Sequence, residues 1–210
     1  MEMMKMRNNR TLGRPPSHKM AQPTNELILK TAAQLFLEKG YAKVSMDDIA
    51  KECNITKASV YYYFNTKAFL YTETMIQMME RIRNHILAIL QENMPLKARL
   101  QKLATTYLTK TLNIDIDHIM RDTKNNLSET QIQAIQKTEK QMYQVIADQL
   151  EEAMKQGTIR RIEPTFAAHA FMSLLTIAPN QNLGDPPVPQ SIEETVENTI
   201  EFYWRGIAKT

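Results

Sequence analysis

Side chains that could hold a phosphate or the edge of a nucleotide base are concentrated in residues 46–64, with the sequence MDDIAKECNITKASVYYYF. This stretch contains three consecutive tyrosines, Tyr61–Tyr63, and Lys57 lies about one helical turn before them. Tyrosine hydroxyls can donate hydrogen bonds to phosphate oxygens, and tyrosine rings pack on sugars and thymine methyl groups. The chemistry that this stretch offers is therefore recognition of an anionic polymer.

A short helix and a tight turn are expected to precede these side chains in the sequence. Ser45 precedes Asp47 and Asp48, and a serine N-cap followed by carboxylates in the first turn predicts the start of a helix. This helix is expected over residues 46–53. Asn54 follows where the turn needs a positive φ, which asparagine tolerates better than any residue except glycine.

A second short helix, capped by Thr56, is predicted over residues 57–63. Ala50 is the small residue that a close crossing of the two helices needs, and Val60 supplies the apolar contact back onto the first. Because both helices are short, they must pack on a further helix, which is predicted over residues 25–39. This spacing predicts a helix-turn-helix, whose second helix enters the major groove of DNA.

The outward face of the second helix follows from burial of Val60 and Phe64. The side chains then left for solvent or DNA are those of Lys57, Ala58, Ser59, Tyr61, Tyr62 and Tyr63. An alternative is that Tyr61 or Tyr63 is partly buried against a neighbouring helix. Lys67 begins the next predicted helix, where its ammonium and the helix N-terminus can jointly hold a phosphate, and Ser45 at another N-terminus can do the same.

Catalytic and metal sites are not indicated. The four histidines, His18, His85, His118 and His169, are far apart in sequence, and no nucleophile motif or glycine-rich phosphate loop is present. Asp115 and Asp117 flank His118, a pattern more typical of a cap and a solvated turn. The single cysteine, Cys53, is expected to be a small buried residue. We therefore expect no enzymatic activity, no metal and no cofactor.

The formal net charge of the 210 residues is only +3, but its distribution is uneven. Residues 1–67 hold 11 Lys and Arg against 6 Asp and Glu, and residues 68–210 hold 15 against 17. A basic N-terminal part favours an anionic partner for that part alone, although a solvated basic tail gives the same count. No apolar run approaches the length of a membrane span, and one cysteine fits a reducing compartment, so a cytoplasmic protein without a membrane partner is expected.

The rest of the chain is predicted to be helical, which makes the fold class all-α with about nine helices. Thr24 is expected to cap the helix over residues 25–39. Further helices are expected over residues 67–91, from Pro95 to about residue 111, around residues 116–120, and over 128–156, 165–177 and 191–208, with a proline-rich loop at 179–190.

The run from Leu27 to Tyr71 resembles the N-terminal domain of TetR-family (tetracycline-repressor-like) transcriptional regulators. The matching positions are Ala33, Phe36, Gly40, Tyr41, Ser45, Ile49, Ala50, Ile55, Lys57, Tyr61, Phe64 and Lys67. The resemblance implies DNA contacts by Ser45, Thr56, Lys57, Ala58, Ser59, Tyr61, Tyr62, Tyr63 and Lys67. Met46, Asn54 and Ala68 depart from the usual family residues, which leaves the DNA sequence open.

The resemblance also implies three parts: a basic arm (1–23), a helix-turn-helix domain (24–71) and a helical domain for ligand binding and dimerisation (72–210). Phe, Leu, Ile and Tyr with small alanine gaps suit close helix packing. The expected homodimer interface comprises Phe166, Ala170, Phe171, Leu174, Ile192, Val196, Ile200 and Tyr203, and the alternative is that these residues form intramolecular core.

An apolar or amphipathic small-molecule ligand is expected in a methionine-rich pocket. The candidate lining residues are Met75, Met78, Met79, His85, Tyr107, His118, Met120, Met142, Tyr143 and Ile146. The predicted function is a repressor that a ligand releases from a near-palindromic operator in double-stranded DNA. The alternative is a DNA-bound scaffold or structural protein that a partner protein controls.

Overall fold

The computed structural model describes residues 23–111, 126–177 and 191–209. Within these ranges the chain forms eight helices, and its one extended pairing is an antiparallel bridge between Ile159 and Ala208. The helices are α1 (Thr24–Lys39), α2 (Met46–Glu52), α3 (Lys57–Tyr63), α4 (Lys67–Leu90), α5 (Leu96–Thr111), α7 (Glu129–Lys155), α8 (Pro164–Ile177) and α9 (Ile192–Ile207). The all-α prediction is confirmed for these ranges. The helix expected around residues 116–120, the arm and the 179–190 loop lie outside them.

Hydroxyl side chains start most of these helices, and the predicted caps Ser45 and Thr56 are among them. Ser45, Thr56, Ser128 and Ser191 each accept a hydrogen bond from the backbone amide three residues later, which satisfies one free N–H group of the first turn. The expected cap of α1 is wrong. Thr24 is already inside the helix, Pro23 occupies the N-cap position, and no side chain caps it.

The buried residues form two hydrophobic cores. The first lies among α1, α2, α3 and the first half of α4 and also takes in Ile135 of α7. The second joins the second half of α4 to α5, α7, α8 and α9. Because α4 supplies Met75 and Met79 to the first core and Ile86 and Leu90 to the second, one continuous helix connects them. The boundary predicted between residues 71 and 72 falls inside this helix.

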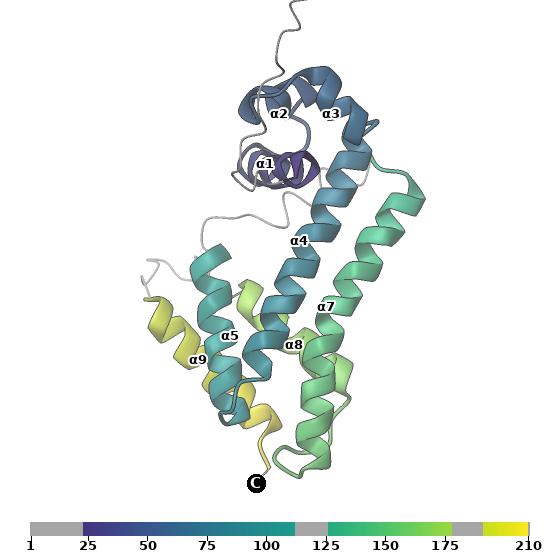
Figure 1. Ribbon diagram of the computed structural model, residues 1–210. Helices are drawn as coiled ribbons and strands as arrows, with labels where there is room; N and C mark the ends of the chain where they lie inside the picture. The colour runs from purple at the N-terminus through teal and green to yellow at the C-terminus, as the bar shows by residue number, and fades with distance from the viewer. Residues whose placement is uncertain (1–22, 112–125, 178–190, 210) are drawn as a thin grey trace, which may run out of the picture.

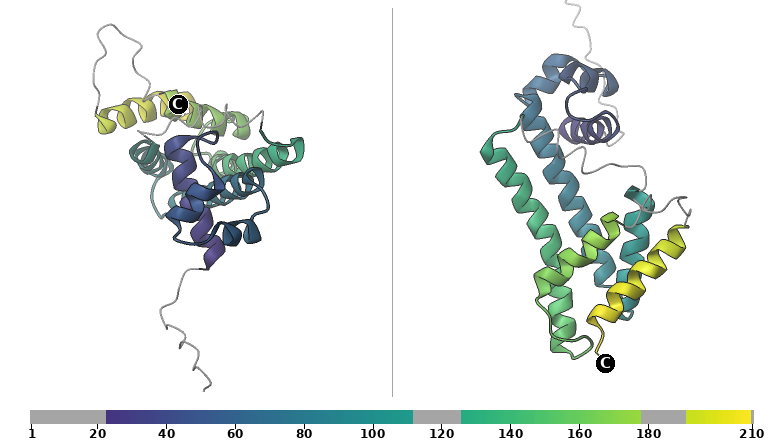
Figure 2. Two further views of the ribbon diagram at one scale, coloured as in Figure 1. Left: turned by 90° about the horizontal axis from the view of Figure 1, so that it is seen from above. Right: turned by 180° about the vertical axis from the view of Figure 1, so that it is seen from behind.

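The molecule is elongated, with α2 and α3 at the end opposite the C-terminus (Figure 1). Helices α4 and α7 run side by side along its length, and α5, α8 and α9 surround the half that is remote from α3 (Figure 2). None of the described helices combines the length and apolar character needed to cross a lipid bilayer.

Candidate nucleic-acid interface

The α2 and α3 helices pack on each other through a tight turn. Ile49, Ala50 and Val60 are at most 4% exposed, so the two helices meet through the contacts that their spacing predicted. The amide of Ile55 donates to the carbonyl of Ala50 over 3.0 Å, and Asn54 adopts a φ of 53°. This left-handed conformation at Asn54 turns the chain from α2 into α3.

The outward face of α3 carries the three tyrosines. Tyr62 is 81% exposed, whereas Tyr61 and Tyr63 are 42% and 41% exposed. All three rings therefore reach solvent, and neighbouring residues cover Tyr61 and Tyr63 more than they cover Tyr62. The Tyr62 and Tyr63 rings meet edge to face with centroids 5.1 Å apart.

A hollow lies beside these rings, between α3 and the beginning of α1. Its volume is about 450 Å³, and it opens to solvent. Its lining residues are Thr24, Ile55, Ala58, Ser59, Tyr62 and Tyr63. The lining combines hydroxyl groups with aromatic and aliphatic carbon, a mixture that fits a sugar–phosphate segment.

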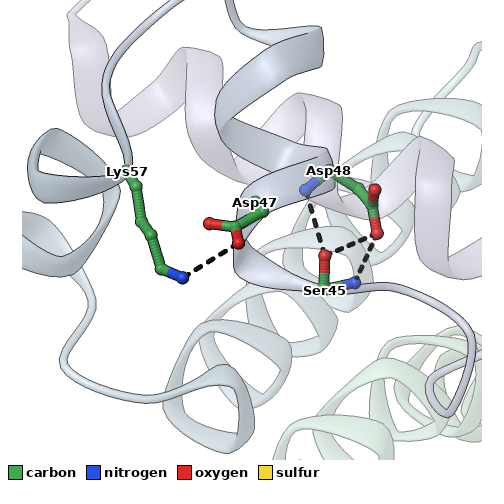
Figure 3. Close-up of polar contacts among 4 residues, drawn as sticks. All are labelled: Ser45, Asp47, Asp48 and Lys57. Carbon is green, nitrogen blue, oxygen red and sulfur yellow. Dashed lines mark hydrogen bonds and ion pairs between the residues drawn. The ribbon is translucent and has the colours of Figure 1, made fainter.

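The first residue of α3 is held by a carboxylate that sequence reasoning missed. Lys57 Nζ lies 2.9 Å from Asp47 Oδ2 of α2 (Figure 3), and it also lies 5.9 Å from the centre of the Tyr61 ring. The bond to Asp47 raises the pKa of Lys57. Asp47 lies ten residues before Lys57 in the sequence. That spacing across a helix-turn-helix was the feature from which their contact could have been predicted.

Ser45 and Asp48 form a closed capping box at the start of α2 (Figure 3). The amide and hydroxyl of Ser45 donate to Asp48 Oδ2 over 2.9 and 2.6 Å, and the amide of Asp48 donates back to the Ser45 hydroxyl over 3.1 Å. These bonds lower the pKa of Asp48. Both donors of Ser45 are thus already used within the chain.

Lys67, at the start of α4, contacts the connection between α1 and α2. Its Nζ lies 4.2 Å from the centre of the Tyr41 ring and donates to the carbonyl of Ala42 over 3.4 Å. Burial lowers the pKa of Lys67, and the carboxylate of Asp48 partly opposes this effect. The structure thus places Thr56–Tyr63 together on one helix, and Lys67 beside the loop that leads into α2.

The residues predicted for a ligand pocket do not come together. Met75 and Met79 are buried in the first core with Met78 packed against it, whereas Ile146 is buried in the second core with Tyr107, Met142 and Tyr143 packed against it. His85 is exposed, and His118 and Met120 lie outside the described residues. The single chain therefore divides these candidates between its two cores, and their part in a ligand pocket stays a prediction.

Two polar side-chain pairs lie at the edge of the second core. The ring of Tyr143 stacks on His169 of α8 with centroids 4.2 Å apart, and the hydroxyls of Tyr107 and Thr176 are 3.4 Å apart. Burial raises the pKa of Tyr143 to about 12.

The residues predicted for the dimer interface divide between core and surface. Phe171, Val196, Ile200 and Tyr203 are at most 5% exposed within the single chain, so for these four the intramolecular alternative describes the chain. Phe166 is 64% exposed, and Ala170, Leu174 and Ile192 are partly buried. Two further apolar residues on these helices are exposed: Ile177 on α8 and Phe202 on α9, at 58% and 70%.

Cys53 is buried, and its sulfur lies 4.0 Å from the carbonyl oxygen of Leu27. Among residues 23–111, 126–177 and 191–209, no three His, Cys, Asp or Glu side chains are grouped so that they could hold a metal ion.

A helix-turn-helix at one end of a longer helical body, as the described residues form here, is typical of helix-turn-helix transcriptional regulators. Residues 28–74 match the family model of bacterial regulatory proteins, tetR family. By this match, the helix-turn-helix part of the chain is of the tetR type.

Two curated relatives and one solved structure agree with this assignment. An uncharacterized HTH-type transcriptional regulator, YhgD of Bacillus subtilis (strain 168), is 23% identical over 187 residues, which cover 88% of this chain and 96% of the relative. IcaR of Staphylococcus aureus (strain Newman), the negative transcriptional regulator of the biofilm operon icaADBC, is 42% identical over 60 residues, which cover 29% and 32%. A putative TetR-family regulator from Mesorhizobium loti MAFF303099 shares the fold with a TM-score of 0.72 and 21% identity, covering 89% of this chain and 97% of that one.

Proposed function

We propose that this protein binds double-stranded DNA through α3 and represses transcription as a homodimer at a near-palindromic operator. The observation that carries the proposal is the exposed face of α3, where Lys57 and Tyr61–Tyr63 point outward from a helix that Val60 anchors to α2. A helix of this kind fits the major groove. Repression is the sign of regulation that the name of IcaR gives for that protein.

The residues of the interface divide by the part of DNA that each can reach. Lys57, Ala58 and Ser59 lie in the first turn of α3 and are proposed to meet base edges. Tyr61, Tyr62 and Tyr63 are proposed to contact phosphates, sugars and thymine methyl groups. Thr56 and Lys67 are proposed to contact backbone phosphates at helix N-termini. Because Ser45 already gives both donors to Asp48, its contribution is to fix the start of α2.

Dimerisation is proposed to use the outer faces of α8 and α9. Phe166 and Phe202 are exposed aromatic side chains on these helices, and burial of such surface is what drives association. A two-fold dimer presents two copies of α3 about 34–36 Å apart, or a multiple of that distance, which matches half-sites separated by whole turns of B-DNA.

Release by a small molecule is proposed to work through α4. This helix contributes side chains to both cores, so a ligand that shifts its second half also moves the base of the DNA-binding part. The division into arm (1–23), DNA-binding domain (24–71) and ligand-binding and dimerisation domain (72–210) belongs to this proposal. The shift requires that the ligand bind the two arrangements with different affinities.

The ligand is proposed to contact the polar cluster formed by Tyr107, Tyr143, His169 and Thr176. These side chains bring hydroxyl and imidazole groups between α5, α7 and α8, next to the apolar side chains of Met142 and Ile146. Polar groups on an apolar wall suit an amphipathic molecule.

Selection from a random-sequence duplex library tests the DNA part. We expect wild-type protein to enrich an inverted repeat, and Tyr62→Ala to weaken binding to every duplex by a similar factor. Tyr41→Phe, which changes a buried ring, is the control and should bind like wild type if it folds. Failure of the wild type to enrich any sequence contradicts the proposal.

Native mass spectrometry of the purified protein tests the ligand part. A bound small molecule that is lost in Tyr143→Ala, together with lower operator affinity when it is added back, supports release by a ligand. Cell extracts with and without protein are then added to the operator complex. If only the extracts that contain protein lower the operator affinity, control by a partner protein is supported instead.

A further inference from the structure

Asp47 is a carboxylate at the surface that we propose for DNA, and it bonds to the first residue of α3. The two side chains meet at 2.9 Å and are 48% and 57% exposed, so both face solvent (Figure 3). A carboxylate near a polyanion weakens binding to any sequence, since it repels every phosphate equally. Its presence there calls for a role other than general affinity.

The local charge balance makes this carboxylate important. Residues 24–67 contain six lysines, no arginine and five acidic residues, which leaves a net charge of +1. Asp48 is already engaged by Ser45. Asp47 therefore neutralises the one lysine that begins α3, at the place where a lysine would otherwise attach to whichever phosphate lies closest.

Lysine chemistry shows how the pair can act in the groove. An ammonium has three donors, so Lys57 can give one hydrogen bond to Asp47 and keep two for the O6 and N7 acceptors of a guanine. A phosphate offers nothing to Asp47, whereas the N4 amino group of the paired cytosine can donate to it. The pair as a unit thus suits a G·C base pair and is unsuited to the DNA backbone.

We propose that Asp47 is a specificity-determining residue of the DNA interface, which positions Lys57 to read a guanine and keeps it from serving as a phosphate anchor. The inference rests on the proposed DNA-binding function. It assigns to α2 a share in sequence discrimination that the exposed face of α3 alone does not provide.

The test compares Asp47→Asn with wild type by fluorescence polarisation on two duplexes across a range of KCl concentrations. One duplex is the sequence that wild type enriches from a random library, and the other is a scramble of the same composition. We expect the variant to bind the scramble about two- to fivefold more tightly, the range that corresponds to an exposed ion pair. Its salt slope on the scramble should steepen by about one phosphate contact, and its preference for the selected duplex should fall.

The same substitution made in a variant that lacks the Lys57 ammonium distinguishes an effect of Asp47 through Lys57 from repulsion between Asp47 and the DNA phosphates. In Lys57→Met, the same Asp47→Asn change should alter affinity for the scramble by less than half as much. Glu38→Gln on α1 removes one negative charge elsewhere and is the matched control, expected to leave the ratio of the two affinities unchanged. Asp47→Ser replaces Asp47→Asn if thermal unfolding shows that the latter does not fold.

An unchanged affinity ratio in a folded Asp47 variant overturns the inference, as does an effect of equal size with and without Lys57. A loss of affinity confined to the selected duplex also overturns it, because Asp47 would then act only through its own base contact. If wild type enriches no sequence at all, the proposed function fails, and that outcome is visible before any variant is measured.

Discussion

The ammonium nitrogen of Lys67 lies 4.2 Å from the centre of the Tyr41 ring, so the first residue of α4 is attached to the connection between α1 and α2. The Tyr41 ring in turn meets Tyr71 of α4 edge to face with centroids 5.1 Å apart. Lys67 and Tyr71, one turn apart on α4, thus both contact the Tyr41 ring. A displacement of α4 along or about its axis has to move the segment that leads into α2.

Replacement of Lys67 by Met removes the charge and keeps most of the apolar stem. We expect the free energy of unfolding to fall by about 0.5–1 kcal/mol, the usual strength of an exposed to half-buried cation–π contact. Operator affinity should fall on all sequences, with a shallower salt slope. Urea titration and polarisation at several salt concentrations measure the two effects, and Lys67→Arg should restore both. An unchanged stability in Lys67→Met contradicts the role of the ring contact.

Replacement of Ser45 by Ala removes the cap of α2 and should cost about 1 kcal/mol of stability. It should also change the response to acid. The bonds from Ser45 lower the pKa of Asp48 below its value in the unfolded chain, so their stabilisation is present above the unfolded pKa and is lost as the pH falls through the folded one. Thermal unfolding between pH 7 and pH 3 should therefore show a weaker acid destabilisation in Ser45→Ala than in wild type. Parallel curves would show that the cap does not perturb Asp48.

Tyr143 should make the protein sensitive to alkali. Burial raises its pKa to about 12, whereas an unfolded tyrosine ionises near pH ~10. The stabilisation from the protonated hydroxyl is complete below pH ~10 and is lost as the pH rises toward the folded value. Tyr143→Phe should lose less stability over this interval. Tyrosinate absorbance during a pH titration of the folded protein checks the assignment, and a variant that loses an early-ionising tyrosine instead contradicts it.

Substitutions of the neighbouring residues Phe202 and Tyr203 on α9 should affect dimerisation and stability separately. Phe202 is 70% exposed, so Phe202→Glu should leave monomer stability nearly unchanged and weaken the proposed dimer. Tyr203 donates to the carbonyl of Ala167 over 2.9 Å in the core, so Tyr203→Phe should cost about 1 kcal/mol of stability without weakening the dimer. Sedimentation equilibrium and urea unfolding distinguish these outcomes. A dimer that survives Phe202→Glu places the interface elsewhere.

Deletion of residues 1–22 should lower DNA affinity on every sequence. This segment carries five Lys and Arg residues and one Glu, against a net charge of +1 on residues 24–67. Each lost phosphate contact reduces the salt slope by about 0.9, so we expect a reduction of about 3 to 4 if the segment lies along the backbone. Circular dichroism of the shortened chain should show that the described helices still form. An unaltered salt slope would mean that these charges remain in solvent.

The helix boundaries could be predicted because their signals are local. Ser45 and Thr56 accept hydrogen bonds from backbone amides three residues later, and Asn54 adopts the left-handed conformation that its position predicted. The error at Thr24 also has a local cause. Pro23 has no N–H to lose and can precede a helix without a hydroxyl partner, so the helix begins one residue earlier than the nearest threonine suggests.

The sequence was enough to predict which side chains the candidate site exposes, but not which side chains of other helices they contact. The exposure of Lys57 and Tyr62 follows from the burial of Val60 on the same short helix. The contact between Lys57 and Asp47 needs two helices to cross at a particular angle, and the contact between Lys67 and Tyr41 needs α4 to lie against the preceding loop. The division of the ligand-pocket candidates between two cores could not be predicted for a related reason: a methionine stripe does not show which core it faces.

Caps, periodicity and turn conformation depend on near neighbours in the chain, so the helices, most of their starting points and the helix-turn-helix over residues 46–64 could be predicted from the amino-acid order. Long-range packing settles what that order left open: the contact of Asp47 with Lys57, the burial of Tyr203 beside an exposed Phe202, and the place of α4 in two hydrophobic cores. These outcomes depend on how helices distant in sequence pack, since the same apolar side chain can fill a core or remain exposed according to whether another helix covers it.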